Sequence, residues 1–189
     1  MAKENRKSKV RLNEFDPKKG LERGAPKWKE ILWYVVKVLF FTSPLPYPYA
    51  FKCGLLRIFG AQIGRQVVIK PKVNIHFPWK LVLGNNVWIG EEVFILNFES
   101  LRIGNNVCIS QRTFLCGGNH NYLEPSMPYR NGPITLMDGC WVGANCFVGP
   151  GVTIGIDTVV TVGSQVTGSL GDNLVCSIPV TPSLKERWK

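Results

Sequence analysis

Two histidines are the side chains of this chain best suited to acid–base chemistry, because the unperturbed pKa of histidine is about 6.5. His120 lies within residues 117–122, where glycines and asparagines are typical of a loop that can meet a substrate. His76 follows Ile75 and precedes Phe77, and we interpret it as an outward or corner residue. A loop histidine is also commonly a plain surface residue, so the residue type alone leaves the role of His120 open.

A carboxylate near His120 could assist it as a base. Glu124 comes four residues later and could hold the imidazole in one orientation through a hydrogen bond. A solvated loop residue is the alternative interpretation of Glu124, and the spacing alone does not separate the two.

Metal chemistry lacks its usual ligand spacing in this chain. The six cysteines form no C-x-x-C pair, and two histidines cannot supply the three ligands of a histidine-bound zinc. We therefore expect no metal. Cys140 and Cys146 each come four residues after an aliphatic repeat position, and we interpret them as packing residues in a reducing cytoplasm.

The elements that must position these residues follow a six-residue repeat. A period of six fits neither an α-helix nor a long alternating strand, and hexapeptide repeats indicate a parallel β-helix. Glycine follows three of the later aliphatic positions directly, at Gly143, Gly149 and Gly155. The aliphatic positions that keep this step in the second half of the repeat region are Leu136, Val142, Val148, Ile154, Val160 and Val166.

The first half of the repeat region has a period of twenty, with Ile63, Leu83 and Ile103 each followed by glycine. Three hexapeptides make a coil of eighteen residues, so a period of twenty predicts a two-residue insertion at one corner of each early coil. These three residues should then stack inside the β-helix. The pairs Asn85-Asn86 and Asn105-Asn106 suit corners that need unusual backbone angles.

The sequence divides into four regions. Residues 1–26 are expected to form a basic, flexible arm, and residues 27–60 a helical cap. Residues 63–171 are the predicted β-helix, with an extended loop at 117–133. Residues 172–189 form a C-terminal tail.

The predicted helices run from Trp28 to about Phe41 and from Tyr49 to Phe59, with three prolines between them. One role for these helices is to cover the open end of the β-helix, whose edge could otherwise pair with another chain. Their aromatic and lysine content also suits helices that lie in a membrane interface. The two roles are compatible.

The formal net charge of +10 is concentrated at the N-terminus, where residues 1–30 hold ten Lys/Arg against five Asp/Glu. Such an arm could bind nucleic acid, an anionic membrane or a phosphate-rich ligand, or simply keep the protein soluble. No nucleic-acid-binding motif accompanies the charge, so we expect no nucleic-acid partner. With no visible signal peptide and no apolar stretch long enough to span a bilayer, we expect a cytoplasmic protein, with peripheral contact at the inner face of the membrane as a further option.

The motifs around His120 and Trp141 resemble those of the hexapeptide-repeat acyltransferases, and most closely the colanic acid and exopolysaccharide O-acetyltransferase family. The resemblance runs from about Pro44 to Val175. It rests on Leu55–Ala61, Pro78–Leu81, Ile109-Ser110-Gln111, Gly117–Tyr122, Cys140–Ala144 and Gly149–Val152. It implies an all-β fold, the left-handed parallel β-helix, and the hand comes from the resemblance alone because ordinary crossovers are right-handed.

The resemblance further implies transfer of an acetyl group from acetyl-CoA to a sugar hydroxyl, with His120 as the catalytic base. It implies a homotrimer with active sites between neighbouring subunits, and a sugar, sugar nucleotide or lipid-linked glycan as acceptor. Asn97 matches a position near the acceptor hydroxyl, although a corner asparagine with positive φ is an equal alternative. With Asn97, the acceptor residues are Tyr122 and Glu124; the CoA residues are Trp141, Gly143, Ala144 and Thr167. Trp141 is equally well explained as a subunit contact.

The chain departs from its relatives after Thr167. They carry Lys-Asp and a proline where this chain has Gly168–Gly171, and a later basic residue is missing near Thr181. Lys185 or Arg187 could replace these contacts to the CoA phosphates. A non-catalytic β-helix, acting as a scaffold or membrane-surface partner that has lost its CoA site, is the alternative function.

Overall fold

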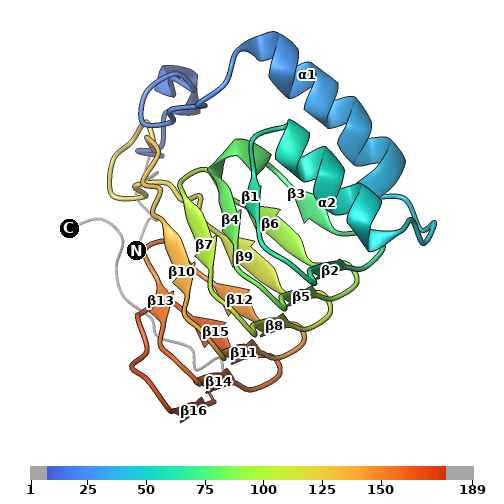
Figure 1. Cartoon of the computed structure of the whole chain (residues 1–189). Coiled ribbons are helices and arrows are strands. Elements are labelled where there is room, and N and C mark those ends of the chain that lie inside the picture. The colour runs from blue at the N-terminus through green and yellow to red at the C-terminus, as the bar shows by residue number, and fades with distance from the viewer. Residues whose placement is uncertain (1–7, 178–189) are drawn as a thin grey trace.

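The computed structural model describes residues 8–177 of the 189-residue chain as a β-helix with helices across its first coil (Figure 1). A short 3-10 turn, η1 (Leu12–Glu14), precedes α1 (Lys27–Val36), which continues as the π-helical turn η2 (Lys37–Phe41). After three prolines, α2 (Tyr49–Ile58) leads into the first coil. The observed helices agree with the predicted ones to within one residue at each end. Lys185 and Arg187 lie outside the described residues.

Sixteen short parallel strands form three sheets in the described chain; the first five coils contribute one strand to each sheet, and β16 extends the second sheet alone. The first sheet holds β1 (Gln62–Ile63), β4 (Leu81–Leu83), β7 (Leu101–Ile103), β10 (Ile134–Leu136) and β13 (Thr153–Ile154). The second holds β2 (Val68–Ile69), β5 (Trp88–Ile89), β8 (Cys108–Ile109), β11 (Trp141–Val142), β14 (Val159–Val160) and β16 (Val175–Cys176). The third holds β3 (Asn74–Ile75), β6 (Phe94–Leu96), β9 (Phe114–Cys116), β12 (Phe147–Val148) and β15 (Gln165–Val166). The predicted parallel β-helix is therefore confirmed.

The aliphatic repeat fills the interior in the predicted register. Ile63 pairs with Leu83, and Leu83 with Ile103, while Leu136 continues the column after the loop. From Leu136 to Val166 every sixth residue is at most 1% exposed. Cys140 and Cys146 are buried beside this column, and burial raises the pKa of the Cys140 thiol to about 12. Both thiols are therefore inert packing groups.

The inserted residues all fall at one corner, where the third sheet turns into the first. The connection from β3 to β4 contains the 3-10 turn η3 (Pro78–Lys80), and the connection from β9 to β10 is the extended loop. From β12 onward this corner is tight, because Ile154 follows Val148 after six positions, whereas the equivalent Ile103 follows Ile95 after eight. His76, Asn97 and His120 all lie at this corner on successive coils. The insertions therefore place the functional candidates on one edge of the β-helix.

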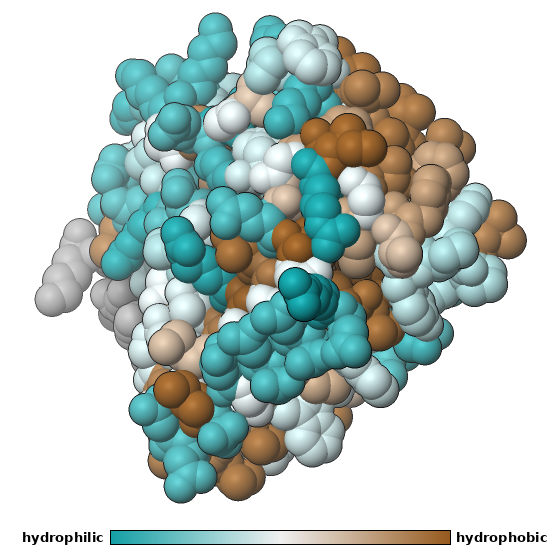
Figure 2. All heavy atoms as spheres, viewed as in Figure 1, coloured by the Kyte–Doolittle hydropathy of each residue, from teal (hydrophilic) through white to brown (hydrophobic). Residues whose placement is uncertain are grey.

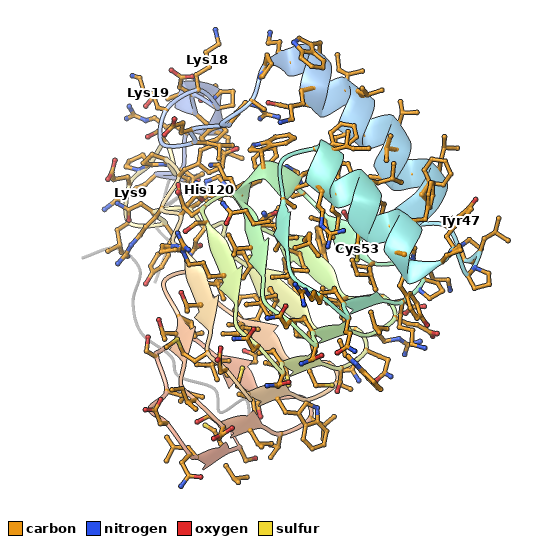
Figure 3. All side chains as sticks on the ribbon, in the orientation of Figure 1. Lys9, Lys18, Lys19, Tyr47, Cys53 and His120 are labelled. Atoms are coloured by element: carbon orange, nitrogen blue, oxygen red, sulfur yellow. The ribbon has the colours of Figure 1, made fainter. Side chains whose placement is uncertain are left out.

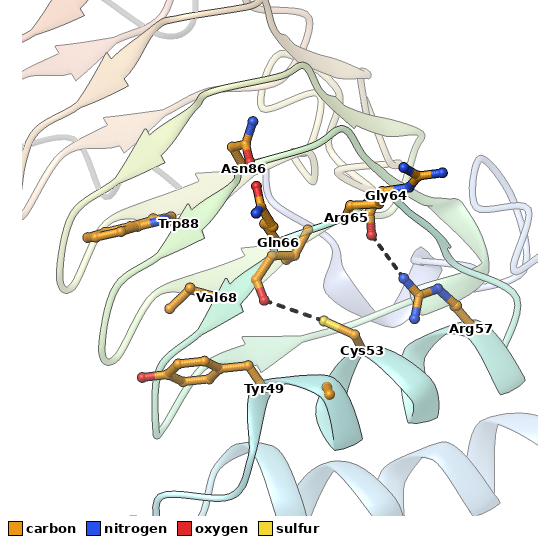
Figure 4. Close-up of a pocket in the computed structure, with 11 residues that line it drawn as sticks. Tyr49, Cys53, Arg57, Gly64, Arg65, Gln66, Val68, Asn86 and Trp88 are labelled. Atoms are coloured by element: carbon orange, nitrogen blue, oxygen red, sulfur yellow. Dashed lines mark hydrogen bonds between the residues drawn. The ribbon is translucent and has the colours of Figure 1, made fainter.

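The helices cap the first coil by donating to its main-chain carbonyls. Elsewhere each coil donates its N–H groups to the carbonyls of the next, as from Gly64 to Leu83 at 2.9 Å. The first coil has no coil before it, so its carbonyls require other donors. The side-chain donors are Trp33 to Ile75, Lys52 to Ile69 and Lys70, Cys53 to Val67, and Arg57 to Ile63 and Gly64. Figure 4 shows the bonds of Cys53 and of Arg57 to Gly64.

None of the described helices has the length and apolar character needed to span a bilayer.

A cavity of about 650 Å³ lies between α2 and the first coils, with Tyr49, Arg57 and Trp88 in its wall (Figure 4). None of the expected site residues lines this cavity.

Candidate active site

His120 is held in one orientation by the extended loop. Its Nδ1 lies 2.6 Å from the carbonyl oxygen of Met127, and its ring stacks on Tyr129 with centroids 5.0 Å apart. A carbonyl only accepts hydrogen bonds, so Nδ1 must carry the proton. The lone pair of a neutral imidazole is then on Nε2, which can act as a base.

The N-terminal arm packs against this loop, in contrast to the flexibility expected for residues 1–26. Phe15 meets the His120 ring edge-on with centroids 5.4 Å apart, and the N–H of Arg11 donates to Pro125 at 2.8 Å. Gly20 accepts a hydrogen bond from the Asn131 amide at 3.0 Å. Figure 3 shows His120 beside the arm that carries Lys18 and Lys19. The arm therefore forms part of the surroundings of the imidazole.

Glu124 does not orient His120. Its carboxylate accepts a hydrogen bond from the Asn121 amide at 2.6 Å, while the Met127 carbonyl occupies the Nδ1 side of the imidazole. Glu124 and Tyr122 are both exposed on the loop. The tight turn of the loop at residues 124–127 brings a main-chain carbonyl to the ring, which makes a carboxylate partner unnecessary.

Asn97 is buried, with 2% of its surface exposed, and both atoms of its amide are bonded to Phe77. Its oxygen accepts from the Phe77 N–H at 2.9 Å, and its nitrogen donates to the Phe77 carbonyl. It is absent from the non-glycine residues with positive φ, so the interpretation as a left-handed corner residue is wrong. The amide joins two successive coils directly beneath the loop.

A cavity of about 450 Å³ opens where the loop meets the tight corner below it. The loop lines it with Gly118, Asn119 and Arg130, and the next two coils contribute Phe147 and Thr167. Thr167 and Asn119, the residue before His120, therefore line the same cavity. No hydrogen bond or ion pair of the described chain occupies the Arg130 side chain, which supplies a positive charge to this cavity.

The other expected CoA residues lie at a different corner. Gly143 and Ala144 follow β11, where the second sheet turns into the third. A Cβ at Gly143 would lie 2.8 Å from the Val160 carbonyl oxygen, so close stacking of the coils requires glycine there. Ala144 presents a main-chain N–H with no partner among residues 8–177. Trp141, 49% exposed, donates its indole N–H to the Ser110 hydroxyl at 2.9 Å.

Several groups at this site were not predicted from the sequence. The Met127 carbonyl is a main-chain group that any residue type supplies, so the sequence holds no signal for it. Tyr129 and Arg130 do carry one, as an aromatic and a basic residue within the singled-out loop. Phe15 lies in a region of low hydrophobicity, and only the packing of the N-terminal arm against the loop brings its ring to His120.

The β-helix with one histidine-bearing loop places the chain in a known structural class. The hexapeptide-repeat acetyltransferase VCA0836 of Vibrio cholerae, complexed with acetyl-coenzyme A, superimposes with a TM-score of 0.70 and 23% identity, covering 78% of this chain and 81% of that one. A galactoside acetyltransferase in complex with coenzyme A gives 0.70 and 24%, covering 79% and 76%. The fold is thus that of the hexapeptide-repeat acetyltransferases.

Sequence similarity gives the particular family. A comparison with models of protein families finds none that matches the chain. The colanic acid biosynthesis acetyltransferase WcaF of Escherichia coli (strain K12) is 39% identical over 176 residues, which cover 93% of this chain and 96% of that protein. The chain belongs to the colanic acid biosynthesis acetyltransferase family, which confirms the resemblance found in its motifs.

Proposed function

We propose that this protein transfers an acetyl group from acetyl-CoA to a hydroxyl of a sugar in surface-glycan biosynthesis, with His120 as the general base. The observation that carries the proposal is the 2.6 Å contact between Nδ1 of His120 and the Met127 carbonyl, because it leaves Nε2 as the basic nitrogen. Family membership and the CoA-bound structures of the same fold supply the donor chemistry.

The reaction needs few groups, because a thioester is already activated. Nε2 of His120 takes the hydroxyl proton as the oxygen attacks the thioester carbonyl carbon. The carbon–sulfur bond then breaks, and the CoA sulfur leaves with the proton that the imidazolium returns. The Met127 carbonyl stabilises the imidazolium through Nδ1–H, and main-chain N–H groups hold the oxyanion. No metal is required in this scheme, and residues 8–177 contain no cluster of potential metal ligands.

The donor site is proposed to span two subunits of a trimer. Within one chain His120 and Thr167 are at the third-to-first corner, whereas Gly143 and Ala144 are one corner earlier. A neighbouring subunit that brings its Gly143 corner and Trp141 to the loop would complete the pantetheine channel. Arg130 is the cation that the 450 Å³ cavity offers to the CoA phosphates in place of the lysine missing after Thr167.

The acceptor is proposed to bind on the loop side of His120, where Tyr122 and Glu124 are exposed. An aromatic ring and a carboxylate suit a sugar, since rings stack on its apolar face and carboxylates accept from its hydroxyls. Asn97 then supports the acceptor side from beneath the loop. A sugar nucleotide or lipid-linked glycan in the cytoplasm presents such a hydroxyl where acetyl-CoA is available.

Release of free thiol from acetyl-CoA, measured against a panel of sugars, sugar nucleotides and lipid-linked glycans, tests this function. His120→Ala should lower turnover by about 10²–10⁴-fold. Leu123→Ala is the matched control, because Leu123 is exposed on the same loop and its main-chain N–H keeps its bond to Asn121. Unchanged turnover in His120→Ala would remove the proposed base.

Calorimetric titration with CoA separates the enzyme from the scaffold alternative. Saturable binding of acetyl-CoA and CoA supports an intact donor site. Absence of both binding and thiol release would favour the scaffold. Binding without release would show that the acceptor is missing from the panel.

A further inference from the structure

The outward face of α1 and η2 is apolar along its whole length. Its residues recur every three or four positions, as on one face of a helix. Each is between 45% and 66% exposed, and together they define the outer stripe: Trp28, Ile31, Leu32, Val35, Val38 and Leu39. Figure 2 shows hydrophobic residues gathered over these helices. A solvated helix would carry polar residues at these positions.

The protein core does not need the outer stripe. The opposite face of the same helix provides the packing, where Trp33 and Phe41 are buried with ring centroids 5.1 Å apart. Leu45, in the loop after η2, and Ile58, in α2, add further exposed apolar surface to the helical layer, at 57% and 76%. An apolar surface of this extent marks a binding surface for another apolar phase or protein.

The charge around the outer stripe is positive. Within α1 and η2, Lys27, Lys29 and Lys37 outnumber Glu30, whose carboxylate is paired with Arg23. Lys37 lies over the Tyr34 ring at 5.5 Å, and desolvation lowers the pKa of its amine. Lys70 lies over Tyr49 at 5.7 Å in the same part of the molecule. Lysines whose stems lie along apolar and aromatic side chains are typical of proteins at membrane surfaces.

We infer that the outer stripe docks in the interface of an anionic membrane, with α1 and η2 lying in the membrane plane. The helix is too short and too charged at its start to span a bilayer, whereas an interfacial helix needs only one apolar face. A second copy of this chain fits less well, because two surfaces of the same positive sign would meet. An anionic lipid surface complements both the stripe and the charge.

Docking in this orientation brings the site near the membrane. Residues 16–26 connect Phe15, which contacts the His120 ring, to the start of α1 at Lys27. On the proposed function, this selects a lipid-linked glycan over a free sugar nucleotide as acceptor. Membrane binding itself is independent of catalysis, so it is testable whether or not the proposed function holds.

Sedimentation of the full chain with vesicles tests the docking. The probe is phosphatidylcholine containing about one third phosphatidylglycerol, with pure phosphatidylcholine for comparison. The double variant Leu32→Glu, Val35→Glu should bind anionic vesicles at least about tenfold more weakly, because two aliphatic side chains no longer enter the interface. Val162→Glu is the matched control, since Val162 is 69% exposed on the β-helix, away from the helices.

Three results would overturn the docking: no binding of the wild type to anionic vesicles, equal binding by the stripe variant and the wild type, or equal loss in Val162→Glu. Size-exclusion chromatography provides a further test, because a stripe variant that dissociates an oligomer would assign the stripe to a second copy. Circular dichroism verifies that each variant is folded. Should the glutamates prevent folding, Leu32→Ser with Val35→Ser gives the same comparison with a smaller perturbation.

Discussion

At the scale of single residues, the two histidines show how surroundings assign different roles to one side chain. His76 lies against Phe77 and Phe98, with centroids 4.5 and 5.1 Å away, and burial together with nearby Lys37 and Arg23 lowers its pKa to about 4. It stays neutral at physiological pH and serves as a packing residue. His120 instead lies on a loop, with Nδ1 bonded to the Met127 carbonyl and Nε2 available, and this arrangement suits proton transfer.

The low pKa of His76 makes stability depend on pH. The unfolded chain binds this proton near pH 6.5 and the folded chain only near pH 4, so the free energy of unfolding falls as pH decreases between these values. The total loss from this group is on the order of 3 kcal/mol. Urea unfolding at pH 7 and at pH 4.5 should therefore show a smaller decline for His76→Gln than for the wild type. Equal declines would contradict this assignment.

Arg130 is predicted to contribute to donor affinity. Arg130→Ala should raise the KM for acetyl-CoA about tenfold with little change in kcat, because a charge-assisted bond to a phosphate contributes about 1.5–3 kcal/mol. Lys9→Ala, on the arm beside the loop, removes the same charge without touching the cavity. An equal effect of both substitutions would mean that net charge, and not the cavity, governs the affinity.

At the scale of elements, the helical cap is a set of hydrogen-bond donors aligned with the first coil. Trp33→Phe removes the donor to the Ile75 carbonyl and part of a buried ring, and should lower the free energy of unfolding by about 2–4 kcal/mol. Trp28→Phe changes the same residue type on the exposed face of the same helix, and should cost less than about 0.5 kcal/mol. Chemical denaturation measures both. Similar losses would show that the donor is unimportant.

The coils were predictable because aliphatic residues recur at a constant step along the sequence. The stacking of Ile63, Leu83 and Ile103 followed from a constant step, and the asparagine pairs marked the corners. The structure divides each pair: Asn86 and Asn106 take φ of 57°, while Asn85 donates its amide to Asn105. The hand of the coil was not predictable from residues, since it depends on crossovers that periodicity does not describe.

The candidate site was predictable only in part. His120 and Thr167 could be named as site residues from the sequence, because the motifs that carry the family resemblance identify them. The Met127 carbonyl and the arm could not, since main-chain geometry and long-range packing determine both. The burial of Asn97 is of the same kind, because the connection between β6 and β7 places its amide against the main chain of Phe77 on the preceding coil.

At the scale of the whole molecule, stability should be graded along the β-helix. Each coil contacts its neighbours alone, and the described helices cover the first coil. Hydrogen exchange should therefore be slowest in β2 and β5 and progressively faster toward β16, because end coils open locally at lower cost. Mass spectrometry of peptides from successive coils measures this gradient. Uniform protection would indicate that the stack unfolds as one unit.

The helical side chains that donate to the carbonyls of the first coil also close that end of the β-helix. A parallel coil is in principle a template on which a further coil, from the same chain or another, can assemble without limit. Trp33, Lys52 and Arg57 occupy the carbonyls that such growth would use, so polymerisation through this end is blocked. Among the described residues, stacking of a further coil is therefore directed to the opposite end of the β-helix, where β16 ends the second sheet.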